Sequence, residues 1–114
     1  MGRGAAASLL LGLGMALPCA AQDRPGLDLF TRADKGQCLA CHQLPPGFGS
    51  QTRDDLGPRL EGVRMRALGA KALRNLLNDP TAANPDTVMP PFGRHRLLDA
   101  REVDKLVEFL LALP

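Results

Sequence analysis

The stretch KGQCLACHQL, residues 35 to 44, decides how this sequence is interpreted. It places Cys38 and Cys41 three residues apart, with His42 directly after them. Residues three apart lie on one face of a helical turn, so the two thiols can reach the same group. Which group that is depends first on the compartment in which the protein works, because thiols are kept reduced in the cytosol and form disulfides in oxidising compartments.

The first residues have the features of an export signal. Arg3 supplies a positive start, residues 5–17 form an apolar run, and Cys19-Ala20-Ala21 offers a cleavage site made of small residues. The apolar run is too short to cross a bilayer. We therefore expect a signal peptide at residues 1–21, cleaved near Ala21, and a periplasmic domain at residues 22–114. A core helix that stays attached and a lipoprotein signal are the alternatives.

Size and charge limit what the exported domain can be. The whole chain has 14 Lys and Arg against 12 Asp and Glu, and loss of Arg3 leaves 13 against 12. A net charge this close to zero gives no reason to expect nucleic acid or an anionic membrane as the partner. The sequence has no Trp or Tyr and only 4 Phe. A domain this small often needs an added group to complete its core.

Apolar residues follow helical spacing in three segments, and no alternating run is long enough for a strand, which predicts an all-α fold. The first segment covers about residues 27–40, the second about residues 70–77, and the second stops before Asp79-Pro80. The third begins at Asp99, which with Glu102 matches a capping box. The expected apolar faces are Leu29, Phe30 and Ala33 in the first segment, Leu73, Leu76 and Leu77 in the second, and Val103, Leu106, Val107, Leu110 and Leu111 in the third.

Residues 78–98, NDPTAANPDTVMPPFGRHRLL, connect the second and third segments without periodicity. A structureless connection of this length is usually a binding loop or a disordered segment. Its apolar content argues against disorder. We therefore expect a group beneath the loop that is covered by Val88, Met89, Phe92, Leu97 and Leu98.

The sequence Cys-x-x-Cys-His is the attachment sequence of c-type haem. Cys38 and Cys41 would each bond the porphyrin, and His42 would supply the proximal iron ligand. A carbonyl at Pro58 could accept from His42 Nδ1, although Gly57-Pro58 is by itself only a turn signal. Three other interpretations are a disulfide, a thioredoxin-like pair and a zinc site. The disulfide would close too short a loop to stabilise much. The thioredoxin-like pair lacks the βαβ pattern that should surround it, and the zinc site lacks further cysteine ligands.

The sixth iron ligand decides the chemistry, and the candidates are Met65, Met89, His95, a lysine or an open position. Met89 is favoured because it precedes Pro90-Pro91, whose restricted backbone can hold a thioether in place. Met65 lies between two arginines, which suits local packing or exposure better. Ligation by His42 and Met89 leaves no vacant site at iron, so it predicts electron transfer.

Four features together resemble a class I c-type cytochrome over nearly all of residues 22–114: the haem motif, the GPRLEG stretch at residues 57–62, the Met-bearing loop and the last amphipathic helix. The resemblance implies a small all-α domain whose first and last helices cross, with one haem c wedged among helices and loops. It also implies that Pro58 orients His42, and that Phe30 lies near Leu106 or Phe109 at the crossing.

Two phrases, GQCLACHQLP at residues 36–45 and DPTAANPDTVMPPFGRHRLL at residues 79–98, resemble the SoxX family of monohaem subunits in periplasmic sulfur-oxidising cytochrome complexes. This resemblance implies haem binding by the residues Cys38, Cys41, His42 and Met89. It implies a SoxA-like catalytic cytochrome subunit as partner, which joins thiosulfate to a sulfur-carrier protein in an L-cysteine S-thiosulfotransferase-type reaction. The chain itself would have no catalysis, and would pass electrons to a soluble cytochrome.

Two rival functions stay open. The first is a free-standing monohaem carrier for another dehydrogenase or oxidase, and the second is a haem enzyme or gas sensor with an open sixth position. The basic residues between Arg59 and Arg74 could steer an acidic partner, although a solvated helix face is the commoner explanation. His95, between two arginines, has the same two interpretations.

Overall fold

The computed structural model describes residues 1–2, 25–48 and 56–114. In these ranges the chain forms helices and loops and no strand, so the all-α prediction is confirmed for them. The expected signal peptide and its boundary with the domain fall on residues 3–24, outside the described residues. Within the described ranges, no helix combines the length and the apolar composition needed to span a bilayer.

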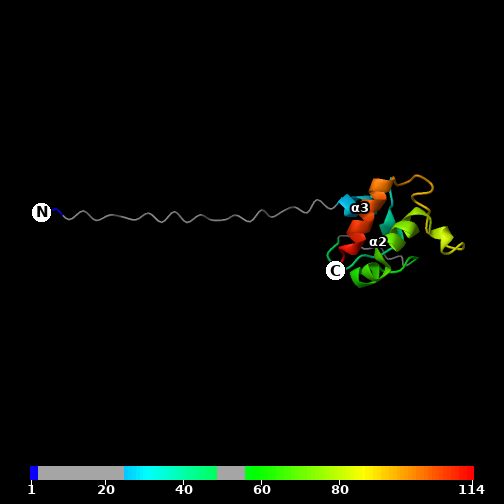
Figure 1. Cartoon of the computed structure of the whole chain (residues 1–114), viewed down its shortest axis with the longest axis horizontal. Coiled ribbons are helices and arrows are strands. Elements are labelled where there is room, and N and C mark those ends of the chain that lie inside the picture. Colours follow the sequence, from blue (N-terminus) through cyan, green and yellow to red (C-terminus); the bar gives the residue numbers. More distant parts are fainter. Residues whose placement is uncertain (3–24, 49–55) are drawn as a thin grey trace.

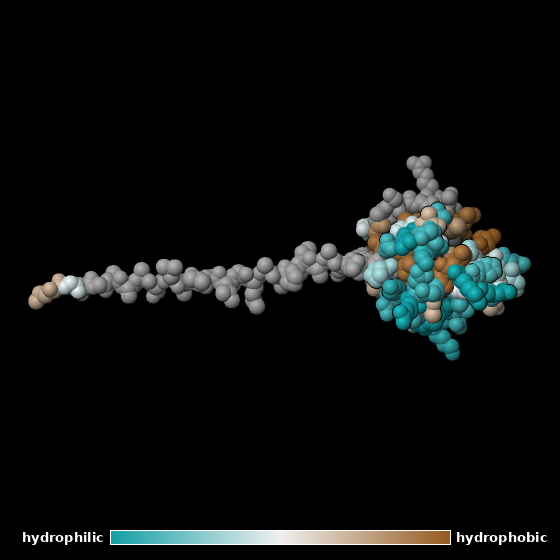
Figure 2. All heavy atoms as spheres, turned by 90° about the horizontal axis from the view of Figure 1, so that it is seen from above, coloured by the Kyte–Doolittle hydropathy of each residue, from teal (hydrophilic) through white to brown (hydrophobic). Residues whose placement is uncertain are grey.

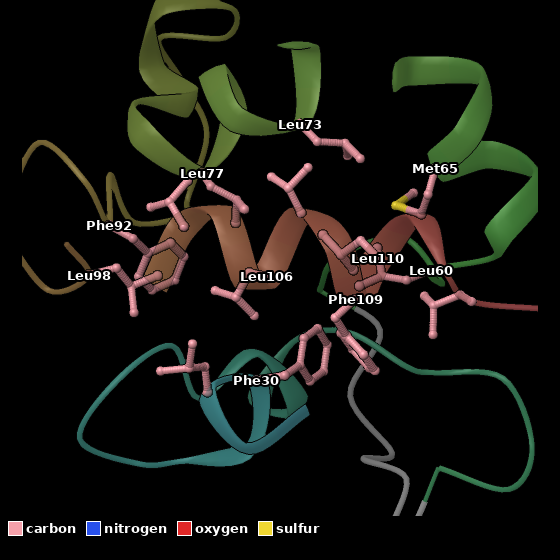
Figure 3. Close-up of a cluster of buried hydrophobic side chains, with 14 of the residues drawn as sticks. Phe30, Leu60, Met65, Leu73, Leu77, Phe92, Leu98, Leu106, Phe109 and Leu110 are labelled. Carbon is pink, nitrogen blue, oxygen red and sulfur yellow. The ribbon is translucent and has the colours of Figure 1, made fainter. Parts of the chain in front are cut away.

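Three α-helices build the described domain, and two short 3₁₀ turns lie between them. In chain order the elements are α1 (Pro25–Thr31), η1 (Cys38–Ala40), α2 (Gly62–Asn78), η2 (Pro80–Ala82) and α3 (Ala100–Leu111). Helix α3 packs against both α1 and α2 (Figure 1). In the close-up of the core, α3 runs between α2 on one side and α1 on the other (Figure 3). Most of the face seen in Figure 2 is hydrophilic, as expected when the apolar side chains gather around α3.

Helix α3 begins with the predicted capping box. Asp99 Oδ1 accepts from the Glu102 backbone N–H over 2.9 Å, and Glu102 Oε2 accepts from the Asp99 N–H over 2.9 Å. The two carboxylates thus satisfy backbone donors that a helix start leaves without intrahelical partners. The buried residues of α3 are Val103, Leu106, Val107, Phe109 and Leu110. Leu111, which was expected in the same stripe, is only half-buried.

The first and last helices cross at two aromatic rings and a glycine. The rings of Phe30 and Phe109 are 5.8 Å apart between centroids and tilted by 57° (Figure 3). This contact confirms the one expected at the crossing. A Cβ on Gly26 would collide with Phe109 Cβ and lie 2.6 Å from the Lys105 carbonyl oxygen. The helices therefore approach closely because Gly26 has no side chain.

The expectation that the first helix continues to Ala40 was wrong. Helix α1 ends at Thr31, and Lys35 N–H and Gln37 N–H both donate to the Arg32 carbonyl in a turn. Gln37 has a left-handed backbone with φ of 44°. Lys35 also pairs with Glu102 of α3 over 2.7 Å, so this turn is joined to α3. Ala33, expected on the buried face, is exposed.

The second helix is longer than expected. It starts at Gly62 and is interrupted at Gly69, where φ is 79° and ψ is 164°, so residues 62–68 and 70–78 form two helical parts joined by a kink. The first part was missed because its exposed face is also apolar: Val63 and Leu68 are exposed while Met65 is buried. A helix whose apolar residues lie on both faces has no amphipathic pattern to detect.

The loop from residue 79 to residue 98 is closed at its two ends. Arg94 pairs with Asp79 over 3.2 Å, the Arg94 N–H donates to the Asn78 carbonyl over 2.9 Å, and the Gly93 N–H donates to the Leu77 carbonyl over 3.2 Å. These bonds also satisfy the last carbonyls of α2. The loop is therefore a compact structure that returns to its own starting point.

The five apolar residues that were expected to cover a group beneath this loop differ in how far the protein itself buries them. Phe92 and Leu98 are buried and gather with Leu77 at one end of α3 (Figure 3). Met89 is half-buried and packs against the core cluster. In contrast, Val88 is 80% exposed and Leu97 is 45% exposed.

Candidate functional site

The Cys-x-x-Cys-His motif forms one helical turn. The Cys41 N–H and the His42 N–H both donate to the Cys38 carbonyl, over 3.1 and 2.8 Å, and the Ala40 N–H donates to the Gln37 carbonyl over 2.9 Å. This turn puts the two cysteines on one side, as their spacing predicts. Both thiols are free and half-buried.

A second segment lies along the end of this turn. The Gly57 N–H donates to the Cys41 carbonyl over 2.9 Å, and the Leu60 N–H donates to the Gln43 carbonyl over 2.9 Å. Arg59 Nη2 donates to Gln43 Oε1 over 2.8 Å. These three bonds hold the Gly-Pro segment beside the motif.

His42 is held by its ring nitrogen and by its flat face. Its Nδ1 lies 2.7 Å from the Pro58 carbonyl oxygen, which is the contact expected from the sequence. A carbonyl can only accept, so Nδ1 carries the hydrogen and Nε2 keeps its lone pair in the neutral ring. A Cβ on Gly57 would collide with His42 Cε1 and lie 2.6 Å from Nδ1. The imidazole therefore has its position fixed from two directions.

Met89 is placed by two successive turns stabilised by side chains. Asn84 Oδ1 accepts from the Asp86 N–H over 3.1 Å, and the Asn84 carbonyl accepts from the Thr87 N–H over 3.1 Å. Thr87 Oγ1 then accepts from the Met89 N–H over 3.2 Å. The two prolines that follow restrict the backbone on the other side of Met89.

One cavity of about 330 Å³ lies among these three segments. Its lining is Gly36, Gln37, Cys38, Ala40, Cys41, His42, Leu56, Gly57, Pro58, Thr87, Val88, Met89, Pro90 and Phe92. It includes all five predicted site residues, which come from positions up to 51 residues apart in the chain, from Cys38 to Met89. The structure thus brings the whole predicted set together in one place.

The other candidates for the sixth ligand lie elsewhere. Met65 is 3% exposed and packs near Leu60 and Leu110, at the end of α3 away from Phe92 (Figure 3). His95 is exposed, and neither residue lines the cavity. Met65 is therefore a core residue, as local packing predicted.

Three residues of the site were not singled out from the sequence for the contacts they make. Gly36 lies next to the Cys38 thiol, Gly57 lies against the His42 ring, and Thr87 bonds the backbone of Met89. The contact of Gly57 with His42 joins residues 15 positions apart, and the contact of Gly36 with Cys38 depends on how the folded turn directs the thiol, so the spacing of residue types encodes neither. Thr87 did have a signal in the sequence, since a Thr hydroxyl often accepts from the N–H of the residue two positions later, which here is Met89.

The electrostatics disfavour two of the earlier alternatives. Burial raises the pKa of the Cys38 thiol to about 12, whereas a redox-active or metal-binding cysteine needs a lowered pKa. Within the described ranges, no three His, Cys, Asp or Glu side chains are grouped so that they could hold a metal ion. A thioredoxin-like pair and a zinc site are therefore poorly matched to the site.

A haem c fits the groups that are present. Two thiols on one helical turn suit attachment to the two arms of a porphyrin. A neutral imidazole with a free Nε2 and a thioether are a donor pair that haem iron takes. The imidazole lies against the backbone of Gly57, in a space that the side chain of any larger residue would occupy. His42 would hold the iron, and Cys38 and Cys41 the porphyrin.

The basic run from Arg59 to Arg74 is largely used within the fold. Arg59 bonds Gln43, and Arg74 pairs with Asp104 of α3 over 2.7 Å. Arg66 Nη1 donates to the carbonyls of Leu113 and Leu111, over 2.7 and 3.2 Å. Three of the five positive residues thus stabilise the packing of the described domain, which explains their presence without a partner.

Comparison with known proteins identifies the family. No curated protein and no solved structure matches the chain. A family model with the description "Cytochrome C oxidase, cbb3-type, subunit III" matches residues 21–110, most of the 114 residues. The three-helix, strand-free architecture of the described ranges agrees with the predicted class I cytochrome c fold. The chain therefore belongs to the family of that description and is a c-type cytochrome domain.

Proposed function

We propose that this chain is a monohaem electron-transfer protein whose haem is attached through Cys38 and Cys41 and ligated by His42 and Met89. One observation supports the proposal above all: a single cavity is lined by both thiols, the imidazole and the thioether. A haem held in this way supplies a centre that gains and loses one electron, with both axial positions filled. No position is then left at the iron for a substrate.

The protein's part in this function is to hold the ligands in place. The Pro58 carbonyl keeps the hydrogen of His42 on Nδ1 and so directs Nε2 to the iron. Thr87 and the two prolines after Met89 limit the movement of the thioether. Phe92, buried in the core, forms an apolar wall that reduces contact with water. Ligands held in this way need little rearrangement when the charge of the centre changes.

For the cellular setting, we propose export to the periplasm through a signal peptide at residues 1–21 and a role like that of SoxX. In this role a SoxA-like catalytic subunit supplies electrons released as thiosulfate is joined to a sulfur carrier. The chain accepts them and passes them to a soluble cytochrome. The support is the phrase at residues 79–98, which carries Met89 and forms one loop closed by the Asp79–Arg94 pair.

A free-standing carrier is the second candidate, and the family description suggests an oxidase as the acceptor that it would serve. The matching family is described as a subunit of a cytochrome oxidase, so electron delivery to an oxidase is a natural role for a domain of this family. In addition, the loop contacts described above account for several residues of the phrase at 79–98 by folding alone. The two candidates share the haem site and differ only in the partner.

Two measurements on the protein produced in a periplasm test these proposals. Haem staining after denaturing electrophoresis, with a pyridine haemochrome spectrum, should show one haem joined by two thioethers. A chain that loses its haem on denaturation would contradict the attachment. The chain should then be purified from its own thiosulfate-grown cells through a tag joined to the exposed Pro114 by a flexible linker. A second haem-staining subunit in fixed proportion supports the SoxX-like role, and a chain that comes alone supports the free carrier.

A further inference from the structure

Gly36 lies against the thiol of Cys38. A Cβ on Gly36 would be 2.7 Å from Cys38 Sγ and 3.3 Å from the Leu29 carbonyl oxygen. Non-bonded carbon atoms prefer a separation of about 3.5–4.0 Å, and sulfur is larger than carbon. An alanine at residue 36 would therefore need the thiol to move by roughly 1 Å.

The conflict would be with the thiol and not with the backbone of residue 36. The positive-φ glycines of the described ranges are Gly47 and Gly69, so Gly36 has a backbone that alanine can also adopt. The carbonyl of Leu29 is fixed because it belongs to α1. Of the two neighbours, Cys38 Sγ is the closer and the only one that can rotate.

Free rotation is lost when the thiol forms its bond. In the unattached chain, Cys38 can turn about its side-chain bond to make room for a methyl group. Attachment fixes Sγ between its own Cβ and a porphyrin carbon, and Cys38 is also packed against the core cluster. No atom of Cys41 is among the nearest neighbours of a Cβ placed on Gly36. A methyl group at residue 36 should therefore hinder one attachment and spare the other.

We propose that Gly36 is a positioning residue that keeps the Cys38 thiol where it can form its thioether, so that attachment uses both cysteines and not Cys41 alone. The inference rests on the proposed haem attachment. In the step concerned, Cys38 Sγ–H would add across a vinyl C=C bond of the porphyrin. One vinyl carbon would gain a covalent bond to sulfur, and the other would gain a covalent bond to the hydrogen. The π bond and the S–H bond break, and no oxidant or reductant is consumed.

The test compares four periplasmic proteins: wild type, Gly36→Ala, Cys38→Ala and the double variant. Free thiols are alkylated under denaturing conditions and the peptide carrying Cys38 is analysed by mass spectrometry. The pyridine haemochrome spectrum separately counts the thioethers on the haem. We expect Gly36→Ala to raise the alkylated fraction of Cys38 about fivefold or more, with Cys41 still attached. Its haemochrome spectrum should then approach that of Cys38→Ala.

The Cys38→Ala background shows whether Gly36 acts through the thiol. If it does, Gly36→Ala should not change the haem yield further when the thiol is absent. An equal loss of haem in both backgrounds, including a failure to fold in both, would overturn the inference. Two intact thioethers in Gly36→Ala would also overturn it and leave the proposed function standing. A wild-type chain without covalent haem would instead remove the proposed function.

Discussion

The carbonyl oxygen of Pro58 accepts a hydrogen bond from Nδ1 of His42 over 2.7 Å. The acceptor belongs to the backbone, so a side-chain change at residue 58 does not remove it directly. What can break the contact is a displacement of the ring or of the Gly-Pro segment. Because the Gly57 and Leu60 N–H groups bond that segment to the motif, the ring is the more easily displaced of the two.

Gly57→Ala should displace the His42 ring, because a Cβ at this position collides with Cε1. We expect at least about fivefold less haem-loaded protein, or a haem without its usual axial histidine. Haem content per chain and the absorption spectrum of the purified protein measure both effects. Leu56→Ala is the control, since Leu56 lines the same cavity but is 72% exposed. Equal haem content in Gly57→Ala and wild type would show that the ring can move freely.

Two methionines give a matched pair of variants. Met89→Ala should fold, lower the reduction potential by roughly 100–300 mV, and let the reduced protein bind carbon monoxide. Met65→Ala should leave the potential and the carbon monoxide binding unchanged, because Met65 lies in the core away from the cavity. Its effect should be a loss of about 2–5 kcal/mol in the free energy of unfolding. The reverse pattern would make Met65 the ligand.

Thr87→Val should loosen Met89 without removing it. The variant keeps the shape of the side chain and loses the oxygen that accepts from the Met89 N–H. A hydrogen bond of about 1 kcal/mol corresponds to a roughly fivefold larger population with Met89 dissociated. Faster carbon monoxide binding and a weaker iron–methionine absorption band should report this change.

The matched controls for Thr87 are conservative. Thr87→Ser keeps the hydroxyl and should restore wild-type behaviour at the iron. Thr31→Val removes a hydroxyl at the exposed end of α1, which bonds only carbonyls of its own helix. It should leave carbon monoxide binding unchanged. If Thr87→Val bound carbon monoxide no faster than wild type, the prolines alone would suffice to hold Met89.

The sequence predicted those parts of the fold that depend on local patterns. The capping box of Asp99 and Glu102 and the buried stripe of α3 follow from residues three and four apart, and both are present. The break after Thr31 was missed because the apolar spacing gives no sign of the turn in which the Lys35 and Gln37 N–H groups donate to the Arg32 carbonyl. Residues 62–68 were missed because Val63 and Leu68 are exposed. In both cases the spacing of apolar residues did not locate the end or the start of a helix.

The site was predictable in its chemistry and not in its shape. Residue types and spacing single out Cys38, Cys41 and His42, because the motif is local. Met89 follows from the proline pair beside it, and its place in the same cavity agrees with that choice. Gly26, Gly36 and Gly57 matter for the space they leave open, and that space belongs to the folded chain. A glycine in a sequence does not say which neighbour approaches it.

Acid should destabilise the start of α3. The pKa of Glu102 is lowered first by its bond to Lys35, and the pKa of Asp99 is lowered first by the bond from the Glu102 N–H. A carboxyl group with a lowered pKa in the folded state binds its proton more readily when unfolded. The unfolded state therefore gains protons first as the pH falls, and the free energy of unfolding decreases. The decrease should begin near the ordinary carboxyl pKa of about 4 and continue below it.

Glu102→Gln tests this dependence in the haem-loaded protein. The variant should be less stable than wild type at about pH 6, and the difference should shrink as the pH falls below about 4, where the wild-type carboxylate is lost. Urea unfolding at a series of pH values measures it. Lys35→Met should reproduce part of the effect, and the double variant should lose less than the sum, because the two side chains form one pair. Parallel pH profiles for Glu102→Gln and wild type would show that this pair does not couple the cysteine-motif turn to α3.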